Sequence, residues 1–197
     1  LALAGFIGGF VSSTATIAAM GDRSRAAPHL LSQCVSAALC SNIATIVMLV
    51  VVIGALSPAL LATLAWPLAL AGLAALLSAW LVHARSTAID VEHHPVAPGR
   101  PFEPRYALVF AAIVSAILLL SAGVHRWLGD TGVQIAAGLA GFADLHAASA
   151  SVAQLVAAGA IDIGDAGWPV FIALIANSLS KLLMAWLRGR RGFLLRL

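Results

Sequence analysis

Charged residues are scarce in this chain. Asp, Glu, Lys and Arg together make up 10% of its 197 residues, whereas 61% of the residues are hydrophobic. Soluble domains carry about 25% charged residues, so a water-exposed surface around the whole chain is excluded. The longest hydrophilic stretch, residues 84–104, is too short for a soluble domain of its own. We therefore expect a single integral membrane domain over residues 1–197, with the lipid bilayer as its solvent.

The sequence also lacks the motifs of common enzyme and cofactor sites. It contains no glycine-rich phosphate loop, no HExxH or CxxC motif and no nucleophile elbow. We therefore expect neither an enzyme nor a bound cofactor. An intramembrane hydrolase using Ser12 or Ser13 with His146 and Asp144 is the weakest alternative. Nucleic acid is not expected as a partner, because most of the excess positive charge lies in the tail from Arg188, which suits anionic lipid headgroups.

What the chain does contain is six apolar runs, at residues 1–20, 29–54, 58–83, 105–124, 131–159 and 167–187. Each run is near or above the ~20 residues that a helix needs to cross the hydrocarbon core, and none alternates as a strand would. Four prolines lie at or just before the starts of runs, where a missing N–H costs least: Pro28, Pro58, Pro104 and Pro169. The sequence thus predicts an all-α, polytopic membrane protein with about six helical segments.

The arginines leave the orientation of these segments open. If each run crosses the membrane once, five arginines fall on each side: Arg23, Arg25, Arg85, Arg100 and Arg105 against Arg126, Arg188, Arg190, Arg191 and Arg196. A broken or re-entrant segment would produce such a tie, and residues 131–159, long and rich in glycine, are the best candidate. We favour the basic C-terminal end in the cytoplasm, in a bacterial inner membrane.

Apart from Arg105, with which one run begins, only two charged residues lie inside the apolar runs, Asp144 and Lys181. A charge in hydrocarbon costs about 3 kcal/mol or more, so each needs a partner, a bound ion or a change of protonation. Asp144 is therefore the main candidate for binding a metal or other ion, and Lys181 for pairing with it when no ion is bound. We expect the two side chains to share one cavity. The alternatives are a structural, hydrogen-bonded Asp144 and a Lys181 that extends toward Arg188.

Two pairs of similar motifs indicate an internal duplication. Residues 9–15 (GFVSSTA) resemble residues 141–147 (GFADLHA). About thirty residues after each comes an asparagine motif, at residues 41–45 (SNIAT) and 176–181 (ANSLSK). Motifs in the same order at similar spacing are typical of internal repeats in membrane proteins.

The duplication predicts two repeat halves, roughly residues 1–56 and 105–187. Between them lie a linker helix at 58–83 and the hydrophilic loop at 84–104. Repeats of this kind commonly form a binding site at their interface, near the middle of the bilayer.

The duplicated motifs bring polar residues to the middle of four segments: Ser12, Ser13, Thr14, Asn42, Asp144, His146, Asn177 and Lys181. We expect these residues to form one midplane site, with Asn42 and Asn177 within ~10 Å of each other. Glycines at 5–9 and 138–141 should pack against neighbouring helices. The alternative is that the asparagines only join helices and that the hydroxyls bond to carbonyls of their own helix.

The same motifs resemble those of a known family, the C-terminal multi-spanning membrane domain of MgtC/SapB-like proteins, a domain of unknown function. Residues 8–15 (GGFVSSTA) are similar to its GGLVSSTA motif, residues 141–147 (GFADLHA) to GLADVDA, and residues 176–181 (ANSLSK) to SNTLVK. Residues 101–103 (PFE) match a similar tripeptide before the next helix. The resemblance covers nearly the whole chain and implies a membrane domain loosely tied to magnesium homeostasis and transport.

The chain departs from that family in two places. His146 stands where the family usually has Asp, so a cation site with two carboxylates is not expected. The family also has an apolar helix before the first motif, which this chain lacks ahead of residue 8. The natural repeat would therefore be three helices on each side of a linker helix.

Together these features predict a small transporter or channel-like protein for an inorganic ion, a cation before an anion. Asp144 would hold the ion, and Asn42, Asn177 and the hydroxyls of residues 12–14 would replace its hydration shell. His146 would act beside this site as a proton relay. The alternative function is a non-transporting membrane regulator that binds another membrane protein through its Gly/Ala-rich faces. The same faces predict a homodimer.

Overall fold

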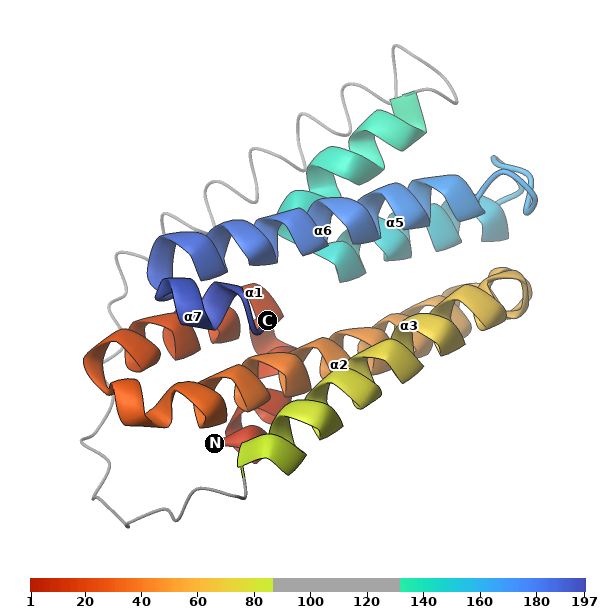
Figure 1. The fold of residues 1–197 in the computed structure, drawn as a ribbon. Coiled ribbons are helices and arrows are strands. Elements are labelled where there is room, and N and C mark those ends of the chain that lie inside the picture. The colour runs from red at the N-terminus through yellow and green to blue at the C-terminus, as the bar shows by residue number, and fades with distance from the viewer. Residues whose placement is uncertain (87–131) are drawn as a thin grey trace.

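The computed structural model describes residues 1–86 and 132–197, and this part of the chain is built from helices joined by short turns (Figure 1). The helices are α1 (Ala2–Ala26), α2 (Leu31–Leu56), α3 (Pro58–Ser86), a helix at Gly132–Ala143, α5 (Leu145–Ala157), α6 (Gly167–Arg188) and the short α7 (Arg191–Leu194), with a 3-10 turn at Pro28–Leu30. Strands are absent from the described residues, as the continuous apolar runs predict. The protein is thus all-helical.

Four helical stretches are long and apolar enough to cross a membrane: Ala2–Ala26, Pro28–Leu56, Pro58–Val82 and Gly167–Arg188. They correspond to the first, second, third and sixth expected segments. The fourth expected segment, 105–124, and most of the hydrophilic loop at 84–104 lie outside the described residues. The number of six segments therefore stays a prediction.

The outer face of α3 is apolar and exposed. Trp66 is 77% exposed, Leu70 61% and Trp80 64%. In water such a face would drive association, whereas hydrocarbon solvates it at no cost. The exposed side chains therefore agree with a membrane protein.

The fifth expected segment is broken, as its length and its glycines predict. The helix Gly132–Ala143 ends before Asp144, whose φ of −151° and ψ of 108° are extended, and α5 begins at the next residue. The two arms meet at an angle (Figure 1). Within the described residues, each arm is shorter than a membrane-spanning helix.

A second break, within α1, was not expected from the sequence. Ser12 has a φ of −166° and a ψ of 107°, so the helix is interrupted there as it is at Asp144. At both breaks the extended residue caps the turn that follows. The Ser12 Oγ accepts a hydrogen bond from the Ala15 N–H at 3.2 Å. The Asp144 Oδ1 accepts from the N–H groups of His146 at 2.8 Å and Ala147 at 3.3 Å. These bonds replace backbone bonds that each break removes.

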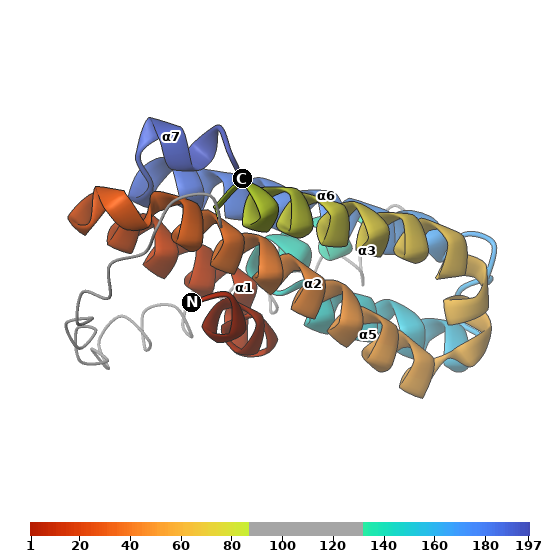
Figure 2. The ribbon, with the colours of Figure 1, turned by 60° about the horizontal axis from the view of Figure 1, so that its bottom comes forward.

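The helical arms that follow the two breaks run in opposite directions along the bundle (Figures 1 and 2). From Ser12, α1 continues to the end of the bundle where α6 terminates, and there the C-terminal ends of α1 and α6 are joined by the hydrogen bond from Arg25 to the Gly189 carbonyl oxygen. From Asp144, α5 continues to the opposite end, where α2 turns into α3 and α6 begins. The long helices α2 and α6 cross the bundle in opposite senses.

Glycines let the broken helices approach their neighbours closely. A Cβ at Gly9 would lie 2.7 Å from the carbonyl oxygen of Ser41, and one at Gly141 would lie 2.5 Å from the Cα of Ala173. Real Cβ atoms do not approach so closely, so only glycine fits at these positions. The prediction that the glycine faces pack against helices is confirmed here. The glycine faces therefore pack against other helices of the same chain.

All six arginines whose side chains the structure describes lie at one end of the bundle: Arg23, Arg25, Arg188, Arg190, Arg191 and Arg196. Arg25 donates to the carbonyl oxygen of Gly189 at 3.0 and 2.8 Å, and Arg188 lies 3.4 Å from the Asp22 carboxylate. These contacts join the ends of α1 and α6. The assumption that every run crosses the membrane once, which separated Arg23 from Arg188, is therefore wrong.

Candidate functional site

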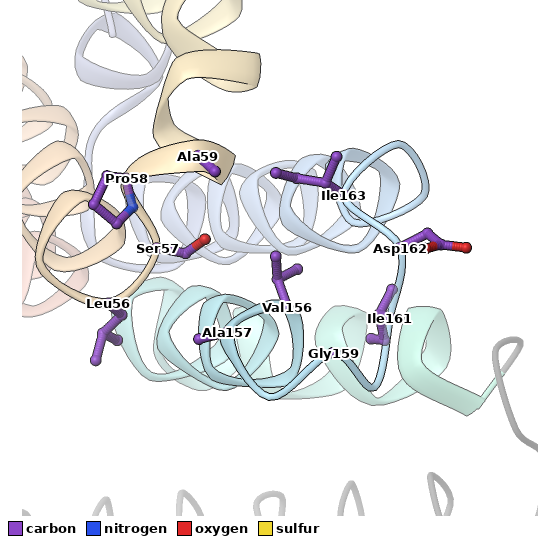
Figure 3. Close-up of a pocket in the computed structure, with 10 residues that line it drawn as sticks. All are labelled: Leu56, Ser57, Pro58, Ala59, Val156, Ala157, Gly159, Ile161, Asp162 and Ile163. Carbon is purple, nitrogen blue, oxygen red and sulfur yellow. The ribbon is translucent and has the colours of Figure 1, made fainter.

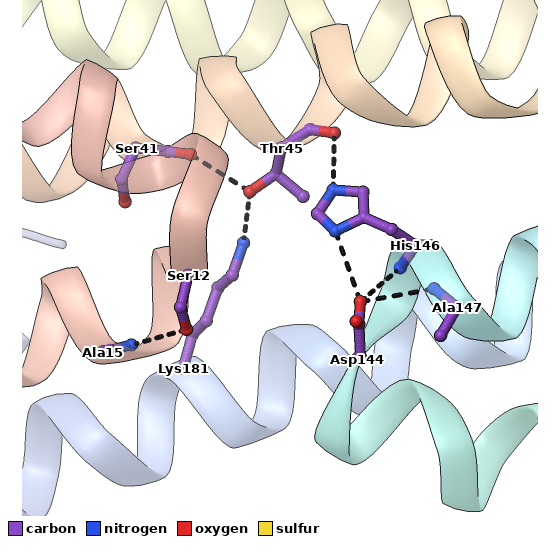
Figure 4. A network of polar contacts seen from close by, with 8 residues as sticks. All are labelled: Ser12, Ala15, Ser41, Thr45, Asp144, His146, Ala147 and Lys181. Carbon is purple, nitrogen blue, oxygen red and sulfur yellow. Dashed lines mark hydrogen bonds and ion pairs between the residues drawn. The ribbon is translucent and has the colours of Figure 1, made fainter. Parts of the chain in front are cut away.

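A polar level separates two apolar cores in the bundle. One core includes Leu49 of α2 and Ala173 of α6, and the other includes Leu39 of α2 and Ala185 of α6. The residues between them are Ser41, Asn42 and Thr45 on α2, Asn177, Ser180 and Lys181 on α6, and Asp144 and His146 at the start of α5 (Figure 4). Five of the polar residues predicted from the sequence, Asn42, Asp144, His146, Asn177 and Lys181, thus lie at the level between the two cores.

Lys181 is the buried cation of this level. It is 7% exposed, and its Nζ donates to the Asn42 Oδ1 at 3.0 Å and to the Thr45 Oγ1 at 3.1 Å. Its side chain crosses to α2 instead of extending toward Arg188 (Figure 4). In the described part of the chain, no carboxylate lies within ion-pair distance of the ammonium. Two neutral oxygens therefore hold a charge that is expensive to bury.

Asp144 sits at the break before α5 and holds the first turn of that helix. The same Oδ1 that caps α5 lies 3.3 Å from the Nδ1 of His146. The Asp144 side chain is 45% exposed, and its Oδ2 has no partner among the described residues. One oxygen of the carboxylate is thus structural, whereas the other contacts no polar group in the part of the chain that the structure describes.

His146 joins α5 to α2. Its Nδ1 faces the Asp144 carboxylate, and its Nε2 lies 3.4 Å from the carbonyl oxygen of Thr45. A residue two positions from Asp144 would point elsewhere on a continuous helix, so the break is what brings the two side chains together. Both ring nitrogens face acceptors, and both contacts are hydrogen bonds only when the ring carries two protons.

Thr45 is the residue that the sequence analysis missed. Its Oγ1 accepts from Lys181 and donates to the Ser41 carbonyl oxygen at 3.0 Å, while its own carbonyl oxygen faces His146. It belongs to the asparagine motif at 41–45, one helical turn after Ser41, so the motif held the signal. Only the fold shows that this residue links the two charged groups.

The expected pair of Asp144 and Lys181 is not direct. Asp144 pairs with His146, and the two charges are connected through His146 and Thr45 (Figure 4). A chain of polar contacts across three helices thus takes the place of an ion pair. Whether one cavity contains both side chains stays a prediction.

The remaining predicted residues lie around this chain of contacts. Asn177 is 5% exposed, lies one turn before Lys181, and has no hydrogen-bond partner among the described residues. Asn42 contacts α6 at Lys181, and the expected closeness of Asn42 to Asn177 stays a prediction. Ser13 is buried, whereas the hydrogen bonds of Ser12 stay within α1, to Ala15 and Thr16. Thr14 is half-buried and forms no described contact with the network.

A metal role for Asp144 rests on a single carboxylate. The described residues contain no group of three or more His, Cys, Asp or Glu side chains that could hold a metal ion. Hard cations also accept carbonyl, hydroxyl and water oxygens, so amides and hydroxyls would have to complete such a site.

A cavity of about 470 Å³ lies at the end of the bundle away from the arginines (Figure 3). It is lined by the α2–α3 turn and by the segment after α5, and its lining is mostly aliphatic. Ser57 points into this region but caps α3 by accepting from the Leu60 N–H at 3.3 Å, and Asp162 points away. We therefore see no cluster of polar or charged side chains in this cavity that could form a binding or catalytic site.

A family model described as "Domain of unknown function (DUF4010)" matches residues 1–189. No curated protein and no solved structure matches the chain. The function must therefore be argued from the site.

Proposed function

The chain belongs to the DUF4010 family, and we propose that it is a membrane transporter or channel-like protein that moves a small inorganic ion through the polar level between its two cores. One observation carries this proposal: Asp144, His146, Thr45, Lys181 and Asn42 form a continuous chain of contacts beside a helix break. Groups that cost so much to bury are rarely retained in membranes for stability alone.

The broken helices support transport. A break exposes backbone groups at mid-membrane, and transporters use such groups to coordinate ions. We propose that residues 1–56 and 105–187 are inverted repeats. The breaks at Ser12 and Asp144 lie at the same position of the duplicated motif and have nearly the same φ and ψ, and the arms that follow run to opposite ends. The ion would bind where these repeats meet.

We place the family in the MgtC/SapB-like group, as the C-terminal membrane domain of such proteins, because its motifs occur in the same order. The same argument makes this a multi-pass protein of a bacterial inner membrane. All described arginines lie at one end, and the positive-inside rule puts that end in the cytoplasm.

The carboxylate favours a cation as the transported ion. The Oδ2 of Asp144, which has no partner among the described residues, would be the strongest acceptor at this level, and Lys181 would balance its charge when no ion is bound. Asn42 and Asn177 would supply amide oxygens. A homodimer stays a prediction, but the glycine faces on which it rested pack inside the chain.

Flux of a panel of cations and anions into liposomes with purified protein tests the proposal. We expect Asp144→Asn to reduce flux to the level of protein-free liposomes, because asparagine retains the cap but removes the charge. The matched control is Asp165→Asn, which neutralises an exposed carboxylate at the bundle end and should leave flux unchanged. If the folded wild-type protein moves no ion, transport is refuted and the non-transporting regulator is favoured.

A further inference from the structure

The end of the bundle that carries the arginines contains a second cavity, of about 310 Å³. It lies between the end of α1 and the segment that follows α6. Its lining residues are Arg25, Trp186, Gly189, Arg190, Arg191 and Leu194. Arg25 forms one wall because its guanidinium donates two hydrogen bonds to the Gly189 carbonyl oxygen. The cavity is thus held together by contacts between residues far apart in the sequence.

Among the described residues, no carboxylate compensates the positive charge of this cavity. Three of its lining residues are arginines and none is a carboxylate. The only described carboxylate at this end, Asp22, already lies against Arg188 at 3.4 Å. Arg190 and Arg191 are exposed and have no ion-pair partner in the described part of the chain. The cavity is therefore suited to an anion.

The same cavity also has an apolar side. Trp186 is 63% exposed, and Leu194 lies in the wall with it. Trp186 stands in the last turn of α6, a candidate membrane span, so it lies at the depth where tryptophan meets headgroups. A free inorganic anion would use the arginines but not the tryptophan and leucine. A molecule with an anionic head and an apolar tail would use both.

We propose that this cavity binds an anionic phospholipid, with its phosphate among Arg25, Arg190 and Arg191 and its glycerol and upper acyl chains against Trp186 and Leu194. The bound lipid would bridge α1 and the segment after α6 at the membrane surface. This site does not depend on the polar level or on any ion flux.

Native mass spectrometry of the full chain in detergent, titrated with phosphatidylglycerol or phosphatidylcholine, tests the proposal. We expect the wild type to prefer phosphatidylglycerol. R190Q/R191Q should weaken phosphatidylglycerol binding by about fivefold for each arginine removed. R190K/R191K should retain most of the binding, because lysine keeps the charge. W186A should also weaken phosphatidylglycerol binding although it removes no charge, because Trp186 would contact the apolar part of the lipid.

The matched control is R23Q/R196Q, which removes two charges from the same end but none from the cavity lining. It should change lipid binding by less than about twofold if the site is local. Equal losses in both double variants would overturn the site in favour of diffuse surface attraction. Displacement of the lipid by equimolar inorganic phosphate would overturn the lipid assignment in favour of a free anion. All substituted arginines are at least partly exposed, and circular dichroism with size-exclusion profiles would verify that each variant is folded.

Discussion

The two broken helices have nearly the same backbone and differ in chemistry. At Ser12 the extended residue is neutral, and its hydroxyl bonds only within α1. At Asp144 the extended residue is charged, and its carboxylate also faces His146, which reaches α2. Because the neutral break adopts the same geometry, a charge is not needed to form it. The difference shows that the extended geometry does not depend on the charge of Asp144, which is why we assign that charge to the proposed ion site.

The largest effect is expected when the residue at the second helix break is replaced by the serine found at the first. Asp144→Ser should keep the extended geometry, since serine caps as well as aspartate, but should abolish ion flux. Stability should change by less than about 1 kcal/mol apart from the lost His146 contact. Liposome flux and thermal unfolding in detergent measure the two effects. Normal flux in this variant would contradict a role for the carboxylate.

The reverse exchange, Ser12→Asp, serves as its control. It adds a carboxylate at mid-membrane without a histidine two residues later, and should destabilise the protein by about 2 to 3 kcal/mol. It should not create new flux. A neutral effect on stability would mean that the first break is open to water.

Close packing sharpens the comparison, because both breaks depend on a glycine three residues earlier. Gly9→Ala and Gly141→Ala should each destabilise the fold by about 1 to 3 kcal/mol, since the added Cβ overlaps the neighbouring helix. The matched control is Gly164→Ala, where the added Cβ would have no atom within 4 Å. Thermal unfolding of the three variants tests the prediction. A loss at only one of the two glycines would mean that the breaks are not equivalent.

Lys181 on α6 contacts Asn42 and Thr45 of the asparagine motif at residues 41–45. A substitution of Lys181 therefore tests whether the transported ion is a cation or an anion. Lys181→Met removes a positive charge that would repel a cation bound at this level, so we expect cation affinity to rise by about tenfold. Concentration dependence of flux measures this change, with Ser178→Ala, an exposed hydroxyl on the same helix, as the control. A fall in affinity would show that the ion is an anion bound by Lys181.

The smallest expected effect concerns the caps themselves. Ser12→Ala removes one capping bond and should cost about 1 kcal/mol. Asp144→Ala removes two capping bonds and the His146 contact, so it should cost roughly twice as much. Unfolding curves of the two variants under the same conditions give the ratio. Equal costs would mean that the charge adds nothing to the second cap.

The break at Asp144 was predictable and the break at Ser12 was not. Residues 131–159 form the longest apolar run and contain several glycines, which are local signals. Residues 1–20 have the right length for an unbroken helix, and a serine inside a helix usually bonds to its own backbone. The duplicated motif held the missing information, since Ser12 occupies the position of Asp144 in it.

From the sequence alone, the apolar surroundings of the helices, the helices themselves and a shared level for several polar residues could be predicted. These follow from composition, run length and position along a run, which are properties of each segment alone. The tertiary structure decided the partners. Lys181 bonds to Thr45 across 136 positions, and His146 contacts the same residue across 101 positions. It also decided that the arginines of α1 and α6 share one end. No single segment encodes such contacts, because they depend on which helix faces which and on how often the chain crosses the bundle.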